Sequence, residues 1–252
     1  MISPGQRAAA QPAWVVGTGF LGSALCRALL LCLGIDSAAP ADVCGDAADP
    51  AVLARAAARL EPQVVFCCMA THGGDAAAYR HAYLDVVAAL PRGPRVVFCS
   101  STSAGHGAGE RKDILRAAEQ AVLESGGVVA RLAPLYGPGR CELLRRHLAG
   151  EPRLPGPPAR PLNYLHVQDA AAALLLLAAA PAAVYPVCGE SLSKSAAYAL
   201  LERLTGVPAA AADAPASHRG LAEQAVDSAA IRALGWAPRH SLADFISLSC
   251  HA

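Results

Sequence analysis

A glycine-rich turn between an apolar strand and a helix constrains this chain more than any other feature. The apolar run Ala13–Val16 precedes it, the largely apolar segment Ser23–Leu31 follows it, and the turn itself is Gly17-Thr18-Gly19-Phe20-Leu21-Gly22. In that context Gly17 permits a tight turn, Gly19 lets the backbone approach a diphosphate, and Gly22 lets the helix pack closely on the strand. The free N–H groups at the start of such a helix favour phosphate. We therefore predict a dinucleotide-binding turn.

Downstream of this turn, short apolar runs alternate with helix patterns, which is typical of a doubly wound parallel sheet. Asp49 before Pro50 is a helix-start signal, and Gly126-Gly127 is a stop signal. Continuous apolar runs are expected of strands buried on both faces. The predicted strands are Cys32–Asp36, Val64–Met69, Arg95–Cys99 and Val128–Leu132, and the predicted helices are 50–60, 79–90 and 113–124.

The regular alternation of strand and helix patterns ends after Leu132. Seven prolines between Pro134 and Pro161 mark irregular loops there. Helices are expected again at Asp169–Ala180, Lys194–Thr205 and Ser228–Leu234. We predict a dinucleotide-binding α/β core of the Rossmann type in residues 1–132. Residues 133–252 are expected to complete the sheet and to form a small substrate lobe.

Composition excludes several classes of function. The net charge of +1 gives no electrostatic reason to expect nucleic acid or an anionic membrane as a partner. The apolar segment Ala170–Ala180 is too short to cross a bilayer. Nine cysteines without a CxxC pair, and without histidines at zinc spacing, predict a reduced cytoplasmic protein and no metal site.

Five segments, in order, resemble the extended short-chain dehydrogenase/reductases, the NAD-dependent epimerase/dehydratase group. The first is the glycine turn, and the second is the strand end Val97–Ser103, which is similar to the strand that carries the family's active-site serine. The others are Arg131–Gly139 with Tyr-Gly-Pro-Gly, Asn163–Asp169 with His-Val-Gln-Asp, and Val226–Trp236 ending in Leu-Gly-Trp. The resemblance runs from about residue 13 to residue 246.

The resemblance implies a Rossmann-type fold, NAD as cofactor, a small-molecule substrate and a homodimer formed through helices beside the sheet. Asp36 would accept hydrogen bonds from the ribose and disfavour the extra phosphate of NADP, although NADP remains the alternative cofactor. Asp46 matches a family position near the adenine. Other implied cofactor contacts are Met69, Ala70 and Leu132, and the implied substrate contacts are Ala133, Pro134 and Asn163.

The chain departs from the family in its proton-transfer residues. No tyrosine is followed by a lysine four positions later, and the alignment puts Arg111 and Leu115 where the family has that pair. A leucine cannot lower the pKa of a neighbouring acid. Ser101, with its neighbour Thr102, occupies the family's serine position, and the candidate replacement acids are His106 and Tyr164. Each of these residues also has a plain structural interpretation.

Three functions therefore stay open. The first is an NAD(P)-dependent oxidoreductase or epimerase-like enzyme acting on a hydroxyl or carbonyl of a small metabolite, with an atypical proton donor. The second is a lyase, isomerase or cyclase that uses the same fold without net redox chemistry. The third is a catalytically silent NAD-binding module.

Overall fold

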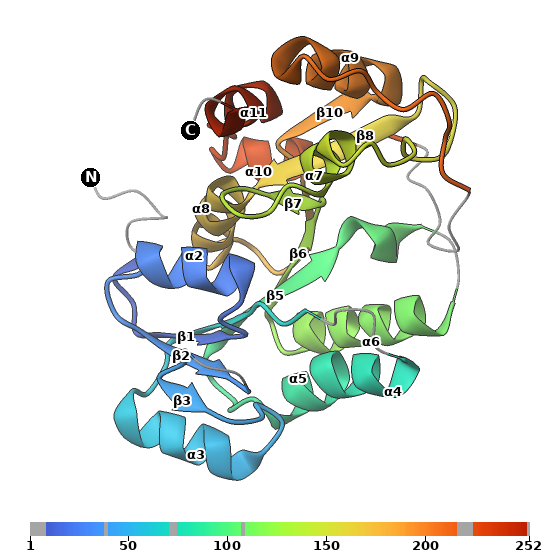
Figure 1. The fold of residues 1–252 in the computed structure, drawn as a ribbon. Coiled ribbons are helices and arrows are strands. Elements are labelled where there is room, and N and C mark those ends of the chain that lie inside the picture. Colours follow the sequence, from blue (N-terminus) through green and yellow to red (C-terminus); the bar gives the residue numbers. More distant parts are fainter. Residues whose placement is uncertain (1–8, 38–39, 71–74, 107–108, 216–223, 251–252) are drawn as a thin grey trace.

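A parallel sheet of seven strands forms the centre of the molecule (Figure 1). The computed structural model describes residues 9–37, 40–70, 75–106, 109–215 and 224–250. The strand order is β3-β2-β1-β4-β5-β6-β9, so the sheet grows outward in both directions from the β1–β4 pair. This confirms the predicted doubly wound fold. The strands are β1 (Ala13–Val16), β2 (Cys32–Asp36), β3 (Val43–Cys44), β4 (Val64–Cys67), β5 (Arg95–Ser101), β6 (Val128–Leu132) and β9 (Val184–Val187).

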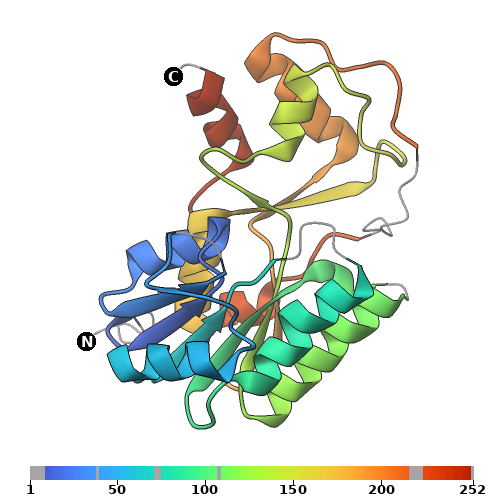
Figure 2. The same ribbon diagram turned by 60° about the horizontal axis from the view of Figure 1, so that its bottom comes forward.

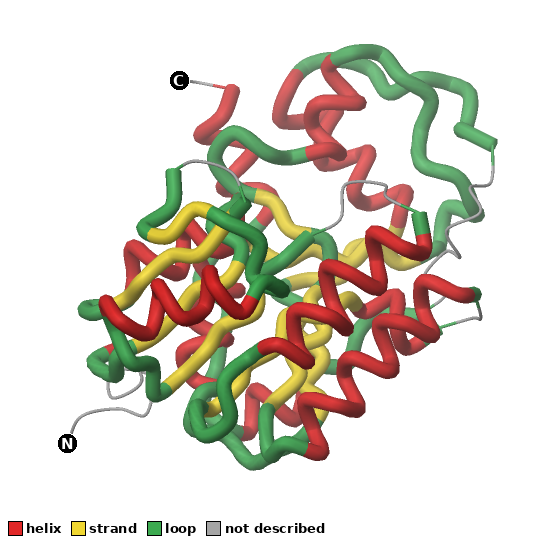
Figure 3. Tube along the Cα trace, turned by 90° about the horizontal axis from the view of Figure 1, so that it is seen from below, coloured by secondary structure: helices red, strands yellow, loops and turns green. Residues whose placement is uncertain are grey.

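Helices cover both faces of this sheet, as Figure 3 shows from below. Because side chains alternate along a strand, Val15 of β1 joins the hydrophobic cluster on one face, and Trp14 joins the cluster on the other. The first face is covered by α2 (Phe20–Ala28), α8 (Val167–Leu177) and α10 (Ala229–Ala233). The second is covered by α3 (Pro50–Arg59), the helical segment 76–89 and α6 (Glu110–Glu124).

Capping side chains explain where several helices begin. The Asp49 carboxylate accepts a hydrogen bond from the Ala51 N–H and starts α3 where the sequence predicts it. Asp75 accepts one from the Ala78 N–H, so the segment predicted to begin at Tyr79 begins earlier. That segment is α4 (Ala76–Tyr79), a π-helical turn (Arg80–Asp85) and α5 (Val86–Ala89).

A small lobe follows β6 and lies at one end of the molecule (Figure 2). Its three-stranded sheet has the order β10-β8-β7, and a hydrophobic cluster of its own lies beneath. The sequence did not predict these strands. The lobe contains β7 (Leu135–Tyr136), β8 (Pro161–His166), β10 (Glu190–Ser193), α7 (Glu142–Leu148), α9 (Lys194–Thr205) and α11 (Leu242–Cys250). Among the described helices, none is both long and apolar enough to span a membrane.

A buried ion pair fastens α6 to the sheet. Glu119 is 3% exposed, and its carboxylate accepts hydrogen bonds from Nε of Arg131 at 2.9 Å and from the Arg131 Nη2 at 2.6 Å. The Ser100 hydroxyl donates to the same carboxylate at 2.5 Å. Ser100 and Arg131 are register partners on β5 and β6, so one carboxylate holds two strands and a helix together.

Removing this carboxylate is expected to destabilise the chain strongly, because the Arg131 guanidinium would lose its counter-charge in a mostly buried position. We expect Glu119→Ala to lower the free energy of unfolding by about 3 kcal/mol. Glu124→Ala, at an exposed site on the same helix, should cost less than about 0.5 kcal/mol. Urea denaturation measures both, and equal losses would contradict the assigned role of Glu119.

Candidate functional site

The glycine turn packs so closely that two of its three glycines cannot be replaced without displacing backbone. A Cβ on Gly22 would lie 1.9 Å from the carbonyl oxygen of Gly17. Gly17 itself has φ +87°, and a Cβ there would lie 2.8 Å from the carbonyl carbon of Cys68. These contacts bring the start of α2, the end of β1 and the end of β4 into direct backbone contact, as the turn motif predicts.

Gly19 differs from the other two because the space beside it is open. A Cβ on Gly19 would meet no described atom within 4 Å. Gly19 is the N-cap of α2 and has no side chain that could accept a hydrogen bond from the first N–H groups of the helix. The first turn of α2 also has no acidic residue. The helix therefore presents N–H groups and the positive end of its dipole to open space, which fits the diphosphate of a dinucleotide.

Asp36 ends β2 beside this turn. Its carboxylate accepts a 2.6 Å hydrogen bond from the Thr18 N–H and a 3.2 Å bond from the Thr18 hydroxyl. Gly34, in the same strand, leaves room for Thr18, because a Cβ on Gly34 would lie 2.7 Å from the Thr18 methyl group. Asp36 thus fixes the conformation of the glycine turn and also places a negative charge next to it.

Asp46 follows β3 and is paired with a residue that sequence reasoning did not connect with it. His81, on the π-helical turn, places Nε2 at 2.6 Å from the Asp46 carboxylate, and Asp85 lies 3.5 Å from the other ring nitrogen. Both side chains of the closer pair are about half exposed. Thirty-five residues separate Asp46 from His81, so no local pattern indicates this pairing.

The remaining predicted residues of the core lie at the carboxyl ends of neighbouring strands. Met69 and Ala70 follow β4, and the backbone N of Met69 lies close to Gly17. Ser101 ends β5 and is the register partner of Leu132, which ends β6. In α/β folds this edge of the sheet is where ligands bind. The predicted cofactor and serine positions are therefore gathered at one edge.

The serine segment forms a tight turn after β5. The Ser101 hydroxyl lies 2.8 Å from the Ser103 hydroxyl and accepts a 3.2 Å hydrogen bond from the Ser103 N–H. Thr102 begins the 3₁₀ turn Thr102–Gly105, and His106 ends it with an exposed side chain. Lys112 of α6 donates to the His106 carbonyl at 2.5 Å, so α6 holds this turn in place.

Arg111 and Leu115, which the sequence resemblance aligns with the family's tyrosine and lysine, lie in different environments. Arg111 is exposed, and its guanidinium lies 5.3 Å from the centre of the Tyr79 ring on α4. Leu115 is 5% exposed and belongs to the hydrophobic cluster between α6 and the sheet. Neither side chain offers a proton donor to the sheet edge.

Tyr164 and Asn163 lie on β8 and are enclosed by the lobe. Tyr164 packs edge-on against Tyr136, with ring centres 6.4 Å apart, and burial raises the pKa of Tyr164 far above its usual value of about 10. This argues against Tyr164 as a proton donor. The Asn163 side chain accepts from the Val226 N–H at 3.1 Å and from the Ser191 hydroxyl, so it ties β8 to neighbouring segments.

Ala133 and Pro134 carry the chain from the core into the lobe. Ala133 is buried, and its N–H donates to the Val187 carbonyl at 2.9 Å. Pro134 is exposed, and its carbonyl accepts from the Leu165 N–H at 3.0 Å. Their predicted substrate contact stays a prediction, at a place where core and lobe meet.

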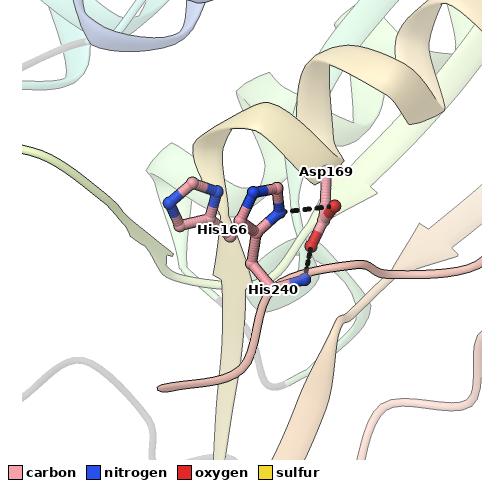
Figure 4. A group of neighbouring side chains, drawn as sticks. All are labelled: His166, Asp169 and His240. Atoms are coloured by element: carbon pink, nitrogen blue, oxygen red, sulfur yellow. Dashed lines mark hydrogen bonds and ion pairs between the residues drawn. The ribbon is translucent and has the colours of Figure 1, made fainter. Parts of the chain in front are cut away.

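A group of three polar side chains joins core and lobe, and the sequence did not connect its third member, His240, with the other two. Figure 4 shows His166, Asp169 and His240, with the Asp169 carboxylate 3.0 Å from Nδ1 of His240. The backbone N–H groups of Arg239 and His240 also donate to this carboxylate, each at 3.0 Å. The two imidazoles stack with centres 4.0 Å apart and planes 18° apart.

The arrangement of this group indicates a structural role rather than a metal centre. His166 accepts from the Gln168 N–H at the start of α8, and burial lowers the pKa of His166, which favours the neutral ring. Ring nitrogens bind a metal ion through lone pairs in the ring plane, and nearly parallel stacked rings do not converge on one ion. Meanwhile the Asp169 oxygens are occupied by three donors.

No protein-family model matches the chain, and no curated protein matches it in sequence. Solved structures do match it in fold. An epimerase of Methanothermobacter thermautotrophicus has a TM-score of 0.81 at 18% identity, over 100% of this chain and 94% of that one. The chain has the fold of this epimerase.

Two further structures extend this likeness to proteins solved with NAD. UDP-glucose 4-epimerase of Thermus thermophilus has a TM-score of 0.77 at 20% identity, covering 95% of this chain and 98% of that one. dTDP-glucose 4,6-dehydratase of Bacillus anthracis has a TM-score of 0.76 at 14% identity, covering 96% of each. The fold implied by the sequence resemblance is thereby confirmed.

Gly22→Ala is expected to disrupt the turn, because the added methyl group would overlap the Gly17 carbonyl. We expect a loss of about 1–3 kcal/mol in the free energy of unfolding, the usual cost of overpacking. Thermal and urea denaturation measure this loss. Gly19→Ala is the matched control, since its methyl group would enter open space, and an equal loss in that variant would contradict the described geometry.

Proposed function

We propose that this chain is an NAD-dependent oxidoreductase with epimerase-like chemistry on a hydroxyl or carbonyl group of a small, sugar-like metabolite. The observation that carries the proposal is the geometry of the glycine turn. Gly17 and Gly22 are packed against backbone, and the space beside Gly19 is open. The proposal is supported by a fold shared with enzymes whose structures contain NAD. Asp36 favours NAD over NADP, because its carboxylate would repel an additional phosphate.

The proposed roles follow from the positions of the residues at the sheet edge. When bound, NAD would supply hydride chemistry, and residues 17–22 with Asp36 would hold it. Ser101 would donate a hydrogen bond to the substrate oxygen. His106 is the proton donor we propose, since its side chain is exposed at the end of the serine turn and imidazole suits acid–base chemistry near neutral pH.

A second candidate, a redox-silent NAD-binding module, is favoured by one observation. Leu115 is buried in the hydrophobic cluster at the position where the family has its lysine, and Arg111 points to Tyr79 instead. If the alignment holds, core packing and a surface contact occupy the positions of the family's proton-transfer residues. Binding of NAD without turnover would identify this function.

NAD binding is tested most directly at Gly19. We expect wild-type protein to bind NAD and Gly19→Ala to lose at least about tenfold in affinity, because the methyl group would occupy the space proposed for the diphosphate. Isothermal titration calorimetry measures the affinities, and an unchanged melting temperature establishes that the variant is folded. If the wild-type protein does not bind NAD, the proposed function is wrong.

Catalysis is tested at Ser101 with a panel of nucleotide sugars, alcohols and carbonyl compounds. Nicotinamide absorbance reports net oxidation or reduction, and chromatographic analysis of the products reports epimerisation, which regenerates the cofactor. We expect Ser101→Ala to lower turnover roughly a hundredfold, because a hydrogen bond to the reacting oxygen is lost. His106→Phe should also lower turnover, whereas Ser103→Ala, one residue beyond Thr102, should leave most of it. Absence of turnover with every compound, combined with NAD binding, would favour the silent module.

A further inference from the structure

The turn that follows β7 brings a part of the lobe against the start of α2. Gly137 and Arg140 exchange two backbone hydrogen bonds, of 2.8 and 2.9 Å, which close the turn. The turn then packs against Phe20, the first residue of α2, since a Cβ on Gly137 would lie 3.2 Å from Cζ of the Phe20 ring. A lobe segment is therefore in van der Waals contact with the glycine turn of the core.

Arg140 adds a positively charged side chain to this contact. Its guanidinium lies 5.2 Å from the centre of the Phe20 ring, and its side chain is exposed. Among the described residues, no carboxylate lies within ion-pair distance of this guanidinium. The neighbouring arginines Arg145 and Arg146 are paired with Glu142 and Glu151, so Arg140 differs from them.

Arg140 thus adds a positive charge beside the first residue of α2, while the Asp36 carboxylate next to the glycine turn is already hydrogen-bonded to Thr18. A cation near a helix N-terminus is electrostatically unfavourable, since that end of the dipole is itself positive. The first turn of α2 contains no acidic residue that could offset it. A bound anion would resolve this repulsion, and guanidinium is the side chain best suited to bind phosphate oxygens through two parallel N–H donors.

We propose that Arg140 binds the diphosphate of NAD from the lobe side, opposite the backbone N–H groups of the glycine turn. This inference rests on the proposed function, because it requires that NAD occupies the turn. The core would then supply neutral donors and a helix dipole, and the lobe would supply the formal charge. Binding of the dinucleotide would in this way hold the turn Gly137–Arg140 against Phe20.

The test is the affinity of the full chain for NAD, measured by calorimetry at low and high salt. We expect Arg140→Ala to bind NAD about tenfold or more weakly, since a charge-assisted hydrogen bond is lost. Arg140→Lys should fall between the two, and the wild-type affinity should depend more steeply on salt than that of Arg140→Ala. ADP-ribose, which keeps the diphosphate and lacks nicotinamide, should lose the same factor.

Arg232→Ala is the matched control, because Arg232 also places its guanidinium over an aromatic ring, 5.5 Å from the centre of Trp236, but on α10. It should bind NAD as the wild type does. An Arg140→Ala variant that keeps the wild-type affinity for NAD overturns this assignment and leaves the proposed function intact. The assignment is also overturned if Arg140→Ala binds UDP, used as a second diphosphate probe, more weakly than the wild type but binds NAD equally well. Wild-type protein that does not bind NAD refutes the proposed function itself.

Discussion

The close approach of backbone to backbone at the glycine turn is the constraint on which the rest of the structure depends. Gly22 can lie against the Gly17 carbonyl only because it has no side chain, and this contact sets how near α2 comes to β1. Gly17 in turn lies against Cys68 at the end of β4. The helix start is thereby fixed at the point where the sheet grows in opposite directions, with its N–H groups facing open space.

The glycine turn and the residues aligned with the family's proton-transfer pair lie on different elements of the core. The glycine turn leads into α2 on one face of the sheet, whereas Arg111 and Leu115, aligned with that pair by the sequence resemblance, lie on α6 on the other face. On α6, Leu115 and Glu119 are both turned to the sheet, one into the hydrophobic cluster and one onto Arg131. The contacts that hold α6 against the sheet therefore do not depend on acid–base residues on this helix.

Much of the core could be predicted from sequence because its signals are local. The continuous apolar run Val64–Cys67 and the segment Val128–Leu132, apolar except for Arg131, lie in strands, and Asp49 caps a helix where predicted. The strands of the lobe escaped prediction, because β7 has two residues and β8 begins at a proline within a proline-rich stretch. Their pairing depends on partners elsewhere in the chain rather than on a pattern of their own.

The residues of the candidate site, too, were predictable only where their sequence signals are local. The glycine turn and Asp36 are indicated by the apolar runs that end beside them, and Ser101 is indicated by the resemblance of its segment to the family's serine strand. By contrast, His81 beside Asp46, and His240 beside Asp169, are brought together from 35 and 71 residues away, and sequence spacing carries no information about such contacts. Tyr164 was proposed as an acid because it has a titratable hydroxyl, yet its position in β8 buries it.

Among the contacts that connect core and lobe, two lie near the start of α2. The Asp169 carboxylate on α8 holds the backbone of Arg239 and His240, the segment that leads into α11 of the lobe. A Cβ on Gly137 would contact Phe20 of the core and, at 3.4 Å, the ring of His166, which belongs to the Asp169 group. The lobe is thus anchored beside the start of α2.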